Sequence, residues 1–194
     1  MQVIGIVGMP GSGKSEAAAV AREAGVPVVT MGDVIRAECR DRGLDPAECH
    51  GQVATALREE HGPAAVAERS LPLIEAALEE SATVLVDGIR SDVEVEAFQA
   101  AFGEDFLLVS IEAPFEVRAA RLADRGRDKP AAEGGEDLAE RDERELGFGM
   151  GRAMDEADLV IENVDSLATF RERIRALLDE GPAAVQGAAD GAGE

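Results

Sequence analysis

Residues 8–15 read Gly8-Met9-Pro10-Gly11-Ser12-Gly13-Lys14-Ser15 and fit the pattern G-x-x-x-x-G-K-[ST] of a phosphate-binding loop. Glycines let successive backbone N–H groups turn toward a bound polyphosphate, because no Cβ blocks the approach. The Lys14 ammonium can reach the β- and γ-phosphates, and the Ser15 hydroxyl can bind Mg²⁺. We therefore expect this loop to hold ATP as co-substrate together with Mg²⁺ as cofactor.

The residues on either side of the loop have the order that such a motif requires. Val3–Val7 is a short apolar run typical of a buried strand, and Ser15–Glu23 has the pattern of a helix. A helix that begins at the loop directs the positive end of its dipole at the phosphates. With a strand before it and a helix after it, the motif is poorly explained as a Gly-rich turn that matches by chance.

Five apolar runs with the length of strands are separated by helical patterns, which is typical of a doubly wound α/β sheet with parallel strands. The runs are Val3–Val7, Val26–Val29, Val84–Val86, Phe106–Ile111 and Leu159–Ile161. Together with the loop they predict an α/β fold of the P-loop NTPase type. We expect three layers, with a five-stranded parallel sheet in the middle.

The stretch from 31 to 80 is far longer than the dozen or so residues that a plain crossover between parallel strands needs. Its pattern is mostly helical, and we expect breaks at Gly43, Pro46, Gly62 and Pro72. The surplus predicts a helical insert over the carboxyl edge of the sheet, where ligands bind in such folds. We expect the insert to bind the acceptor substrate.

A second insertion, at about 124–137, is polar and contains glycines, as a short mobile lid would. An ordinary surface loop is the alternative. Beyond Gly181 the chain has no hydrophobic periodicity, which predicts a disordered tail over 181–194. Residues 1–180 are then expected to form one domain around a single core.

The net charge of −21 argues against nucleic acid or an anionic membrane as partner, since both would repel the protein. Lys14 and Lys129 are the only lysines. Such an excess of carboxylates predicts a halophilic protein, because concentrated salt shortens the range of self-repulsion. A GC-biased genome could also replace Lys by Arg, but it would leave the acid excess unexplained.

Cys39 and Cys49 are the only cysteines, and no metal-binding spacing surrounds them, so a zinc site is not expected. A reduced cytosolic pair is the simpler interpretation. The sequence contains no apolar run near the roughly twenty residues that span a bilayer, and it starts with a strand pattern rather than a signal peptide. We expect a soluble, cytoplasmic protein, and we leave its oligomeric state open.

Two short motifs at the ends of predicted strands point to a second phosphate site. Gly32-Asp33-Val34-Ile35-Arg36 follows the second strand and puts Asp33 and Arg36 on one helix face. Asp87-Gly88-Ile89-Arg90 follows the third strand. Asp87 has the position of an acid that orders Mg²⁺, and Arg90 can hold a phosphate through two parallel hydrogen bonds.

Each of these side chains has a simpler interpretation. A lone arginine in a chain with 40 acids is often part of a surface ion pair, and Asp33 could cap a helix. We favour functional roles for Arg36 and Arg90, because both follow strand ends beside the loop. His50 and His61 have no visible partner in the pattern, so we expect them to be structural.

The motifs resemble those of the nucleoside monophosphate kinase branch of P-loop proteins. Gly32–Arg36 is similar to the acceptor-phosphate motif of adenylate kinases, Asp87–Arg90 to their D-G-[FI]-x-R turn, and Arg121–Arg125 to the segment that enters their lid. The resemblance covers roughly residues 1–178. More closely, the chain resembles an archaeal family of adenylate-kinase-like and dephospho-CoA-kinase-like proteins, through Met31–Val34, Val86–Ser91 and Arg141–Gly149.

This resemblance implies a kinase domain over 1–180 that transfers the γ-phosphate of Mg-ATP to a small nucleotide-type acceptor, above all a nucleoside monophosphate. Residues Ala157–Asn163 are similar to the base-contacting end of dephospho-CoA kinases, so Asn163 either meets the base edge or shapes a turn. The implied catalytic residues are Lys14, Asp33, Arg36, Arg90, Arg121 and Arg125; the nucleotide-binding ones are Gly8, Met9, Pro10, Gly11, Ser12, Gly13, Lys14, Ser15 and Asn163; the metal-binding ones are Ser15 and Asp87.

Two alternatives stay open. Dephospho-CoA kinases phosphorylate a ribose hydroxyl and need a base in the second-strand turn, where this chain has Thr30 and Gly32, with Asp33 one residue further on. A phosphate acceptor needs no base because it is already anionic, and this difference favours the phosphate acceptor slightly. The other alternative is a switch that binds a nucleoside triphosphate and has no small acceptor.

Overall fold

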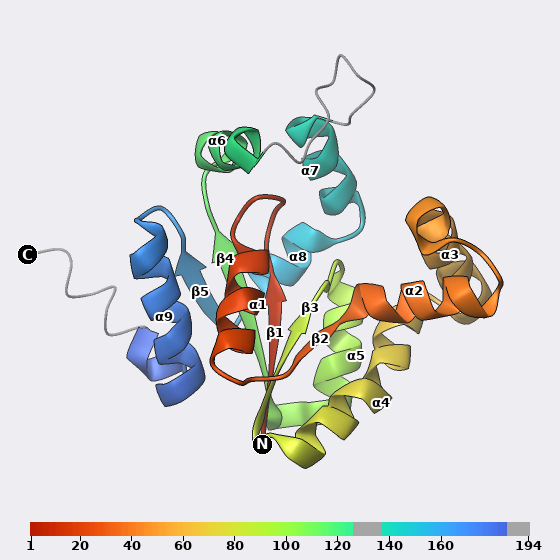
Figure 1. The fold of residues 1–194 in the computed structure, drawn as a ribbon, viewed down its shortest axis with the longest axis horizontal. Helices are drawn as coiled ribbons and strands as arrows, with labels where there is room; N and C mark the ends of the chain where they lie inside the picture. Colours follow the sequence, from red (N-terminus) through yellow and green to blue (C-terminus); the bar gives the residue numbers. More distant parts are fainter. Residues whose placement is uncertain (126–136, 186–194) are drawn as a thin grey trace, which may run out of the picture.

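A five-stranded parallel sheet forms the middle of the molecule, with β1 at its centre (Figure 1). The computed structural model describes residues 1–125 and 137–185, the side chains of 124 and 125 excepted. The strand order is β2-β3-β1-β4-β5, and β1 pairs with both β3 and β4. The strands are β1 (Gln2–Val7), β2 (Val28–Thr30), β3 (Thr83–Asp87), β4 (Phe106–Glu112) and β5 (Leu159–Glu162). The predicted five-stranded parallel sheet is thereby confirmed, although β2 starts two residues later than the apolar run at Val26.

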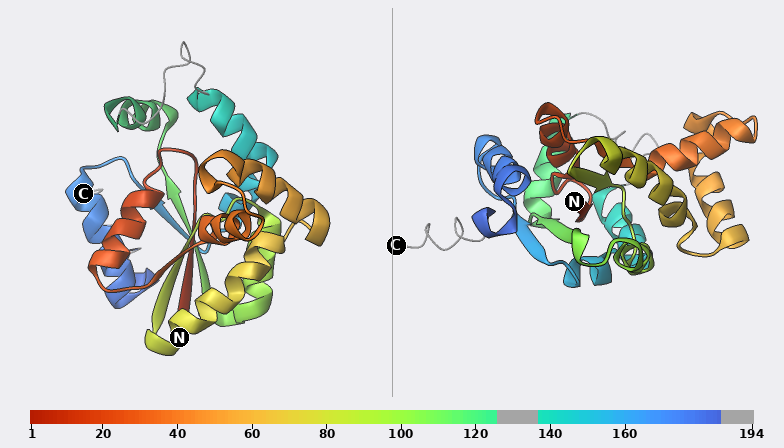
Figure 2. Two further views of the ribbon diagram at one scale, coloured as in Figure 1. Left: turned by 45° about the vertical axis from the view of Figure 1, so that its right-hand side comes forward. Right: turned by 90° about the horizontal axis from the view of Figure 1, so that it is seen from below.

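Helices cover both faces of this sheet, so the fold has the three layers that we expected (Figure 2). Helices α1 and α9 lie on one face, while α4, α5 and α8 lie on the other. The helices are α1 (Lys14–Glu23), α2 (Met31–Asp41), α3 (Pro46–His61), α4 (Ala65–Glu80), α5 (Asp92–Phe102), α6 (Phe115–Arg125), α7 (Leu138–Gly147), α8 (Met150–Asp155) and α9 (Leu167–Glu180). A short 3₁₀ helix spans Gly103–Asp105.

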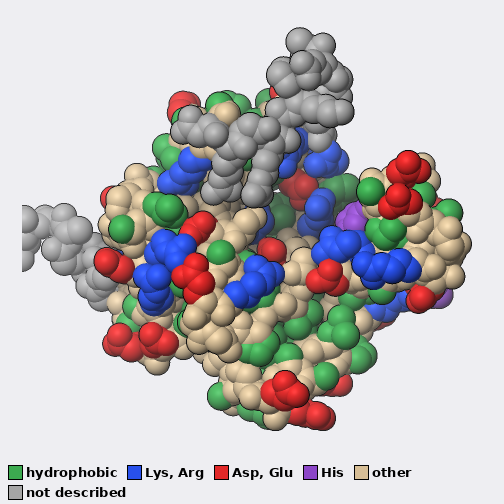
Figure 3. All heavy atoms as spheres, in the orientation of Figure 1, with side chains coloured by type: hydrophobic (Ala, Val, Ile, Leu, Met, Phe, Trp, Pro, Cys, Tyr) green, Lys and Arg blue, Asp and Glu red, His purple; other side chains and the backbone are tan. Residues whose placement is uncertain are grey.

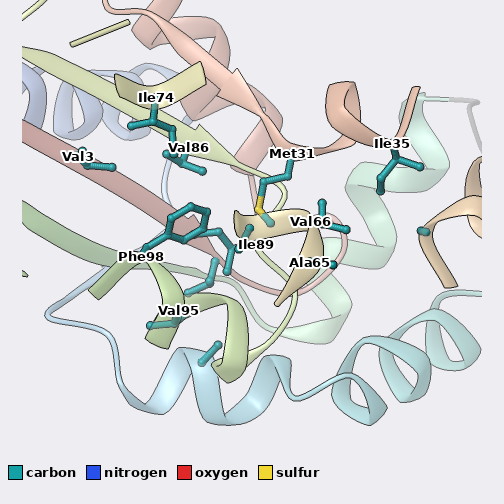
Figure 4. Close-up of a cluster of buried hydrophobic side chains, with 14 of the residues drawn as sticks. Val3, Met31, Ile35, Ala65, Val66, Ile74, Val86, Ile89, Val95 and Phe98 are labelled. Atoms are coloured by element: carbon teal, nitrogen blue, oxygen red, sulfur yellow. The ribbon is translucent and has the colours of Figure 1, made fainter. Parts of the chain in front are cut away.

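Alternation along β1 divides the core in two, because successive side chains of a strand point to opposite faces. Val3 and Val7 belong to the cluster beneath α4, α5 and α8, whereas Ile4 and Ile6 belong to the cluster beneath α1 and α9. In the first cluster Phe98 of α5 packs toward Val86 and Ile89 (Figure 4). Aliphatic side chains fill most of both clusters, as the low aromatic content requires.

The helical insert between β2 and β3 consists of α2, α3 and α4. The Asp45 side chain caps α3 by accepting a hydrogen bond from the N–H of Ala47 at 2.9 Å, and Pro46 occupies the first turn. Expected breaks at Gly43, Pro46 and Gly62 coincide with helix ends. The expected break at Pro72 is wrong, since Pro72 lies inside α4, eight residues into the helix and among residues that pack on the core.

The predicted disorder from Gly181 is wrong for residues 182–185. These four residues are helical, and Val185 is buried in the cluster beneath α1 and α9, so the chain gains apolar contacts that its composition alone does not indicate. Most of the predicted lid, from 126 to 136, lies outside the described residues, as does 186–194. Within the described ranges, the structure contains no helix that is both long and apolar enough to cross a membrane.

Candidate active site

The phosphate-binding loop crosses the carboxyl edge of the sheet between β1 and α1 (Figure 1). Two of its glycines are required by the packing behind them. A Cβ on Gly8 would lie 2.3 Å from the carbonyl oxygen of Ile111, and one on Gly13 would lie 2.4 Å from the side-chain nitrogen of Asn163. Both have positive φ angles, 145° and 123°, which side chains rarely adopt. The loop is therefore pressed against β4 and the segment after β5, with its open side toward the cavity.

The Lys14 side chain folds back onto the loop. Its ammonium donates to the carbonyl oxygens of Gly8 and of Met9, the latter at 3.1 Å. Burial lowers the pKa of Lys14 from 10.5 to about 8, although the nearby carboxylates of Asp87 and Glu145 oppose this shift. A bound polyphosphate would restore the preference for the charged form, because it adds negative charge beside the ammonium.

Ser15 and Asp87 both line the same cavity. Asp87 ends β3, directly beside β1 in the register Ile6↔Asp87. A hydroxyl and a carboxylate are oxygen ligands, which Mg²⁺ prefers, and Mg²⁺ in nucleotide sites commonly uses one or two protein ligands plus substrate phosphates. These two residues therefore fit the predicted metal role. Across residues 1–125 and 137–185, no group of three or more His, Cys, Asp or Glu side chains could hold a metal ion by itself.

A cavity of about 450 Å³ extends from the loop to the helical insert. Its walls come from the phosphate-binding loop, the start of α2, α3, the turn after β3, α7 and α8. Figure 3 shows a hollow on this side of the molecule, flanked by Lys and Arg side chains and by a histidine. Basic side chains thus gather around one hollow in a protein whose net charge is −21.

Arg36 and Arg90, the two residues predicted to hold the acceptor, line the same cavity as Lys14. Arg90 follows β3, and its Nη1 donates to a carboxylate oxygen of Glu145 at 3.0 Å. Arg36 donates from Nε and Nη2 to one oxygen of Asp33, at 3.0 and 2.6 Å. The structure therefore brings the two predicted acceptor arginines into one cavity with the phosphate-binding loop.

Asp33 is not among the described residues that line the cavity. Its side chain is 62% exposed and pairs with Arg36 of the same helix. Asp33 lies in the first turn of α2, whereas the N-cap position is Thr30. This geometry gives no support to Asp33 as a general base, and that role stays a prediction.

Sequence reasoning missed His50 and Arg58, two residues of α3 that line the cavity. Burial lowers the pKa of His50, and the positive charges of Arg36, Arg90 and Arg58 lower it further. A hydrogen bond with the backbone of Gly32 opposes this shift. His50 and Arg58 are eight residues apart, with buried Ala54 halfway between them. This spacing puts the three side chains on one helix face, and it is the signal that could have identified them.

Glu94 connects α3 with the turn after β3. It is 1% exposed and accepts from Nη2 of Arg58 at 3.2 Å and from the backbone N–H of Arg90 at 2.8 Å. A buried carboxylate with partners on both oxygens is a strong positional constraint. Glu94 therefore fixes the insert relative to the turn that carries Arg90.

Asn163 lies behind the loop and is 5% exposed. Its side-chain nitrogen donates to the carbonyl of Ser12 at 2.8 Å, and its side-chain and backbone oxygens accept from Nη2 of Arg121 at 3.1 and 2.9 Å. Of the two interpretations of Asn163, this geometry favours shaping the loop over reading a base. Through Asn163, Arg121 is linked to the phosphate-binding loop.

Arg118 of α6 is 6% exposed and forms a hydrogen bond with the loop itself. Its Nη1 donates to the carbonyl of Pro10 at 3.0 Å, and its guanidinium pairs with Asp142 of α7. Arg141 of α7 lines the cavity. The side chain of Arg125, another predicted catalytic residue, lies outside the described part of the chain.

Comparison with known proteins agrees with this architecture. A family model described as an AAA domain (AAA_17) matches residues 7–138. A UPF0200 protein of Halobacterium salinarum is 62% identical over 178 residues, which cover 92% of this chain and 93% of that protein. The predicted resemblance to an archaeal P-loop family is confirmed.

Solved structures show the fold in more distant proteins. The structure of TT1252 from Thermus thermophilus aligns with a TM-score of 0.60 at 21% identity, covering 92% of this chain and 97% of that one. Shikimate kinase from Bacteroides thetaiotaomicron aligns with a TM-score of 0.56 at 18% identity, covering 92% and 98%. At these identities the likeness establishes a P-loop kinase-like fold and no particular substrate.

Proposed function

The chain belongs to the UPF0200 family, and from that premise we propose that it is a small-molecule kinase. It would transfer the γ-phosphate of Mg-ATP to an acceptor that carries a phosphate of its own. A nucleoside monophosphate is the acceptor that we favour. The observation that carries this proposal is the single cavity of about 450 Å³ shared by Lys14, Ser15, Arg36 and Arg90. The donor phosphates, held by Lys14 and Ser15, and the anionic acceptor, held by Arg36 and Arg90, would then face each other within one cavity.

The chemistry that we propose is a direct transfer. An oxygen of the acceptor phosphate forms a bond to the γ-phosphorus while the bond from that phosphorus to the β,γ-bridging oxygen breaks, and ADP leaves. The attacking oxygen is already anionic, so no proton has to be removed. Lys14 and Arg90 would offset the negative charge, and catalysis would come from positioning and charge stabilisation. Mg²⁺, when bound through Ser15 and Asp87, would neutralise charge on the phosphates.

His50 favours a second candidate, transfer to a hydroxyl group. The hydroxyl reaction needs a base, and a neutral imidazole in the cavity is one. The lowering of the pKa of His50, caused first by burial, favours the neutral imidazole. Dephospho-CoA is the acceptor that would distinguish this reaction, since it offers a ribose hydroxyl. In that case replacing His50 by Gln should reduce turnover with dephospho-CoA while leaving ATP binding intact.

An acceptor screen tests the proposal directly. ADP release from Mg-ATP would be followed in molar KCl with each nucleoside monophosphate and with dephospho-CoA. We expect one monophosphate to raise ADP release well above the rate with water. Arg90→Ala should then lower kcat/KM for that acceptor about a hundredfold, the order of effect seen when a charge-stabilising donor is removed.

Arg40→Ala is the matched control for Arg36→Ala, because Arg40 lies exposed on the same helix. Only the Arg36 variant should lose acceptor turnover. If no acceptor exceeds the rate with water while Mg-ATP still binds, the kinase proposal fails and the nucleotide-dependent switch takes its place.

A further inference from the structure

Glu145 is a buried carboxylate in a cavity that we expect to receive phosphates. It is 7% exposed, it belongs to the last turn of α7, and it lines the cavity. Its Oε1 accepts from Nη1 of Arg90 at 3.0 Å and lies 3.6 Å from Nη2 of Arg144. Its negative charge also reaches Lys14, where it opposes the lowering of the lysine pKa.

A fixed carboxylate in this position repels a polyanionic ligand unless its charge is compensated. Glu145 nonetheless pairs with Arg90, which is one of the two arginines that we expect to bind the acceptor phosphate. The Arg90 side chain is 45% exposed, so the burial of its guanidinium does not require this partner. Folding therefore does not require the contact between Arg90 and Glu145, and we relate this contact to ligand binding.

The Arg90–Glu145 contact also has the geometry of an exchangeable pair. One nitrogen of Arg90 meets one oxygen of Glu145, whereas a guanidinium can grip a phosphate through two parallel hydrogen bonds. If Arg90 turns to a phosphate, Glu145 keeps Arg144 within 3.6 Å and is not left as an isolated buried charge. A dianion can thus replace Glu145 on Arg90, while a neutral ligand cannot.

We propose that Glu145 is an internal substitute for the acceptor anion: it holds Arg90 in the ligand-free protein, and the acceptor binds by replacing it there. Glu145 then sets the acceptor affinity and selects for a dianionic group, because a weakly charged acceptor cannot displace a carboxylate from a guanidinium. The assignment of this anion as the phosphoryl acceptor rests on the proposed function. The exchange on Arg90 does not require turnover.

Phenylglyoxal labelling of Arg90 in the full chain tests the exchange without any knowledge of the natural acceptor. The labelling rate would be read from the mass of the Arg90 peptide, with inorganic phosphate added as the competing anion. Glu145→Gln keeps the shape of the side chain and removes its charge. Glu143→Gln is the matched control, since Glu143 is exposed on the same helix and the same charge is lost.

In the absence of phosphate, Arg90 should be labelled several-fold faster in Glu145→Gln than in the unmodified protein or in Glu143→Gln. The phosphate concentration that half-protects Arg90 should be about tenfold lower in Glu145→Gln, which is the usual scale for losing one charge-assisted contact. Circular dichroism would verify that all three proteins are folded.

Equal labelling and equal protection in the three proteins would overturn the proposal, and so would phosphate that protects Arg90 in none of them. Equal changes in both variants would assign the effect to net charge and would overturn it as well. Failure of the kinase proposal has a different signature: the exchange at Arg90 would be seen, yet no acceptor would raise ADP release.

Discussion

Arg118 of α6 and Asp142 of α7 join the helices that precede and follow the predicted lid in the sequence. Nη1 and Nη2 of Arg118 donate to the two carboxylate oxygens of Asp142 at 2.9 and 2.7 Å, and Nη1 also donates to the carbonyl of Pro10 at 3.0 Å. One buried guanidinium therefore couples the phosphate-binding loop to α7. Because α7 also carries Glu145, the position of that carboxylate depends on this pair.

Replacing Arg118 by Met should lower the free energy of unfolding by about 3 kcal/mol, because Asp142 would be left as a partly buried charge without its partner. Urea unfolding in molar KCl measures this. Arg175→Met is the control, since the Arg175 side chain is 47% exposed and lies 3.8 Å from its nearest carboxylate. Its replacement should change stability by less than about 0.5 kcal/mol. If Arg118→Met and Arg175→Met unfold at the same urea concentration, the structural role of Arg118 is contradicted.

Nucleotide binding should take up protons in mildly alkaline solution. The pKa of Lys14 is about 8 in the free protein, and bound phosphates should raise it. Near pH 7 the ammonium is mostly charged in both states, so little uptake is expected. Near pH 9 it is mostly neutral in the free protein and charged in the complex, so binding of Mg-ADP should take up about one proton, and the affinity should fall as the pH rises above 8.

Calorimetry in two buffers of different ionisation enthalpy measures this uptake. In the Lys14→Met variant the uptake should disappear, at ligand concentrations high enough to compensate for weaker binding. Uptake that persists in the variant would assign the titration to another group.

The pKa of His50 should rise when an anion binds at the acceptor end. Burial is the main reason for its low pKa, followed by the charges of Arg36 and Arg90, and a phosphate between these arginines would offset the charges. Proton NMR can follow the titration, because the chain has 2 histidines and His61→Gln identifies the signals. Arg36→Gln should raise the pKa of His50 in the free protein. If the pKa of His50 changes neither with inorganic phosphate nor in Arg36→Gln, the anion does not bind between these arginines.

Asn163→Ala should weaken the binding of Mg-ADP about tenfold, because the carbonyl of Ser12 loses its donor and the loop loses its support. If Asn163 shapes the loop, pyrophosphate should lose affinity by the same factor. If Asn163 reads the base instead, only ADP should be affected. Titration calorimetry with both ligands separates the two roles.

The acidic composition predicts a dependence on salt. With a net charge of −21, removal of salt lengthens the range of repulsion among the carboxylates, so the far-ultraviolet circular dichroism signal of the fold should be lost on dialysis from molar to millimolar KCl. Readdition of KCl should restore it. Full stability at low salt would remove the halophilic interpretation and leave the acid excess without an explanation.

Local chemistry made most of the fold predictable. The phosphate-binding loop, the five strands and the turn at Asp87-Gly88-Ile89-Arg90 are each specified by neighbouring residues, and parallel strands necessarily bring their carboxyl ends to one edge. Arg36, Arg90, Ser15 and Asp87 could be assigned to one site for that reason. Pro72 and residues 182–185 were predicted wrongly because packing against the core outweighed a local preference.

What the sequence by itself determined is the edge of the sheet at which ligands should bind and the residues that the strand ends deliver to it. Only the tertiary structure decided which side chains arrive from elsewhere: Glu145 and Asp142 from α7, His50 and Arg58 from α3. Their positions depend on how helices cross the sheet, and that depends on contacts between residues far apart in the chain. Arg118 reaches Pro10 across 108 residues, and no periodicity within either segment specifies such a contact.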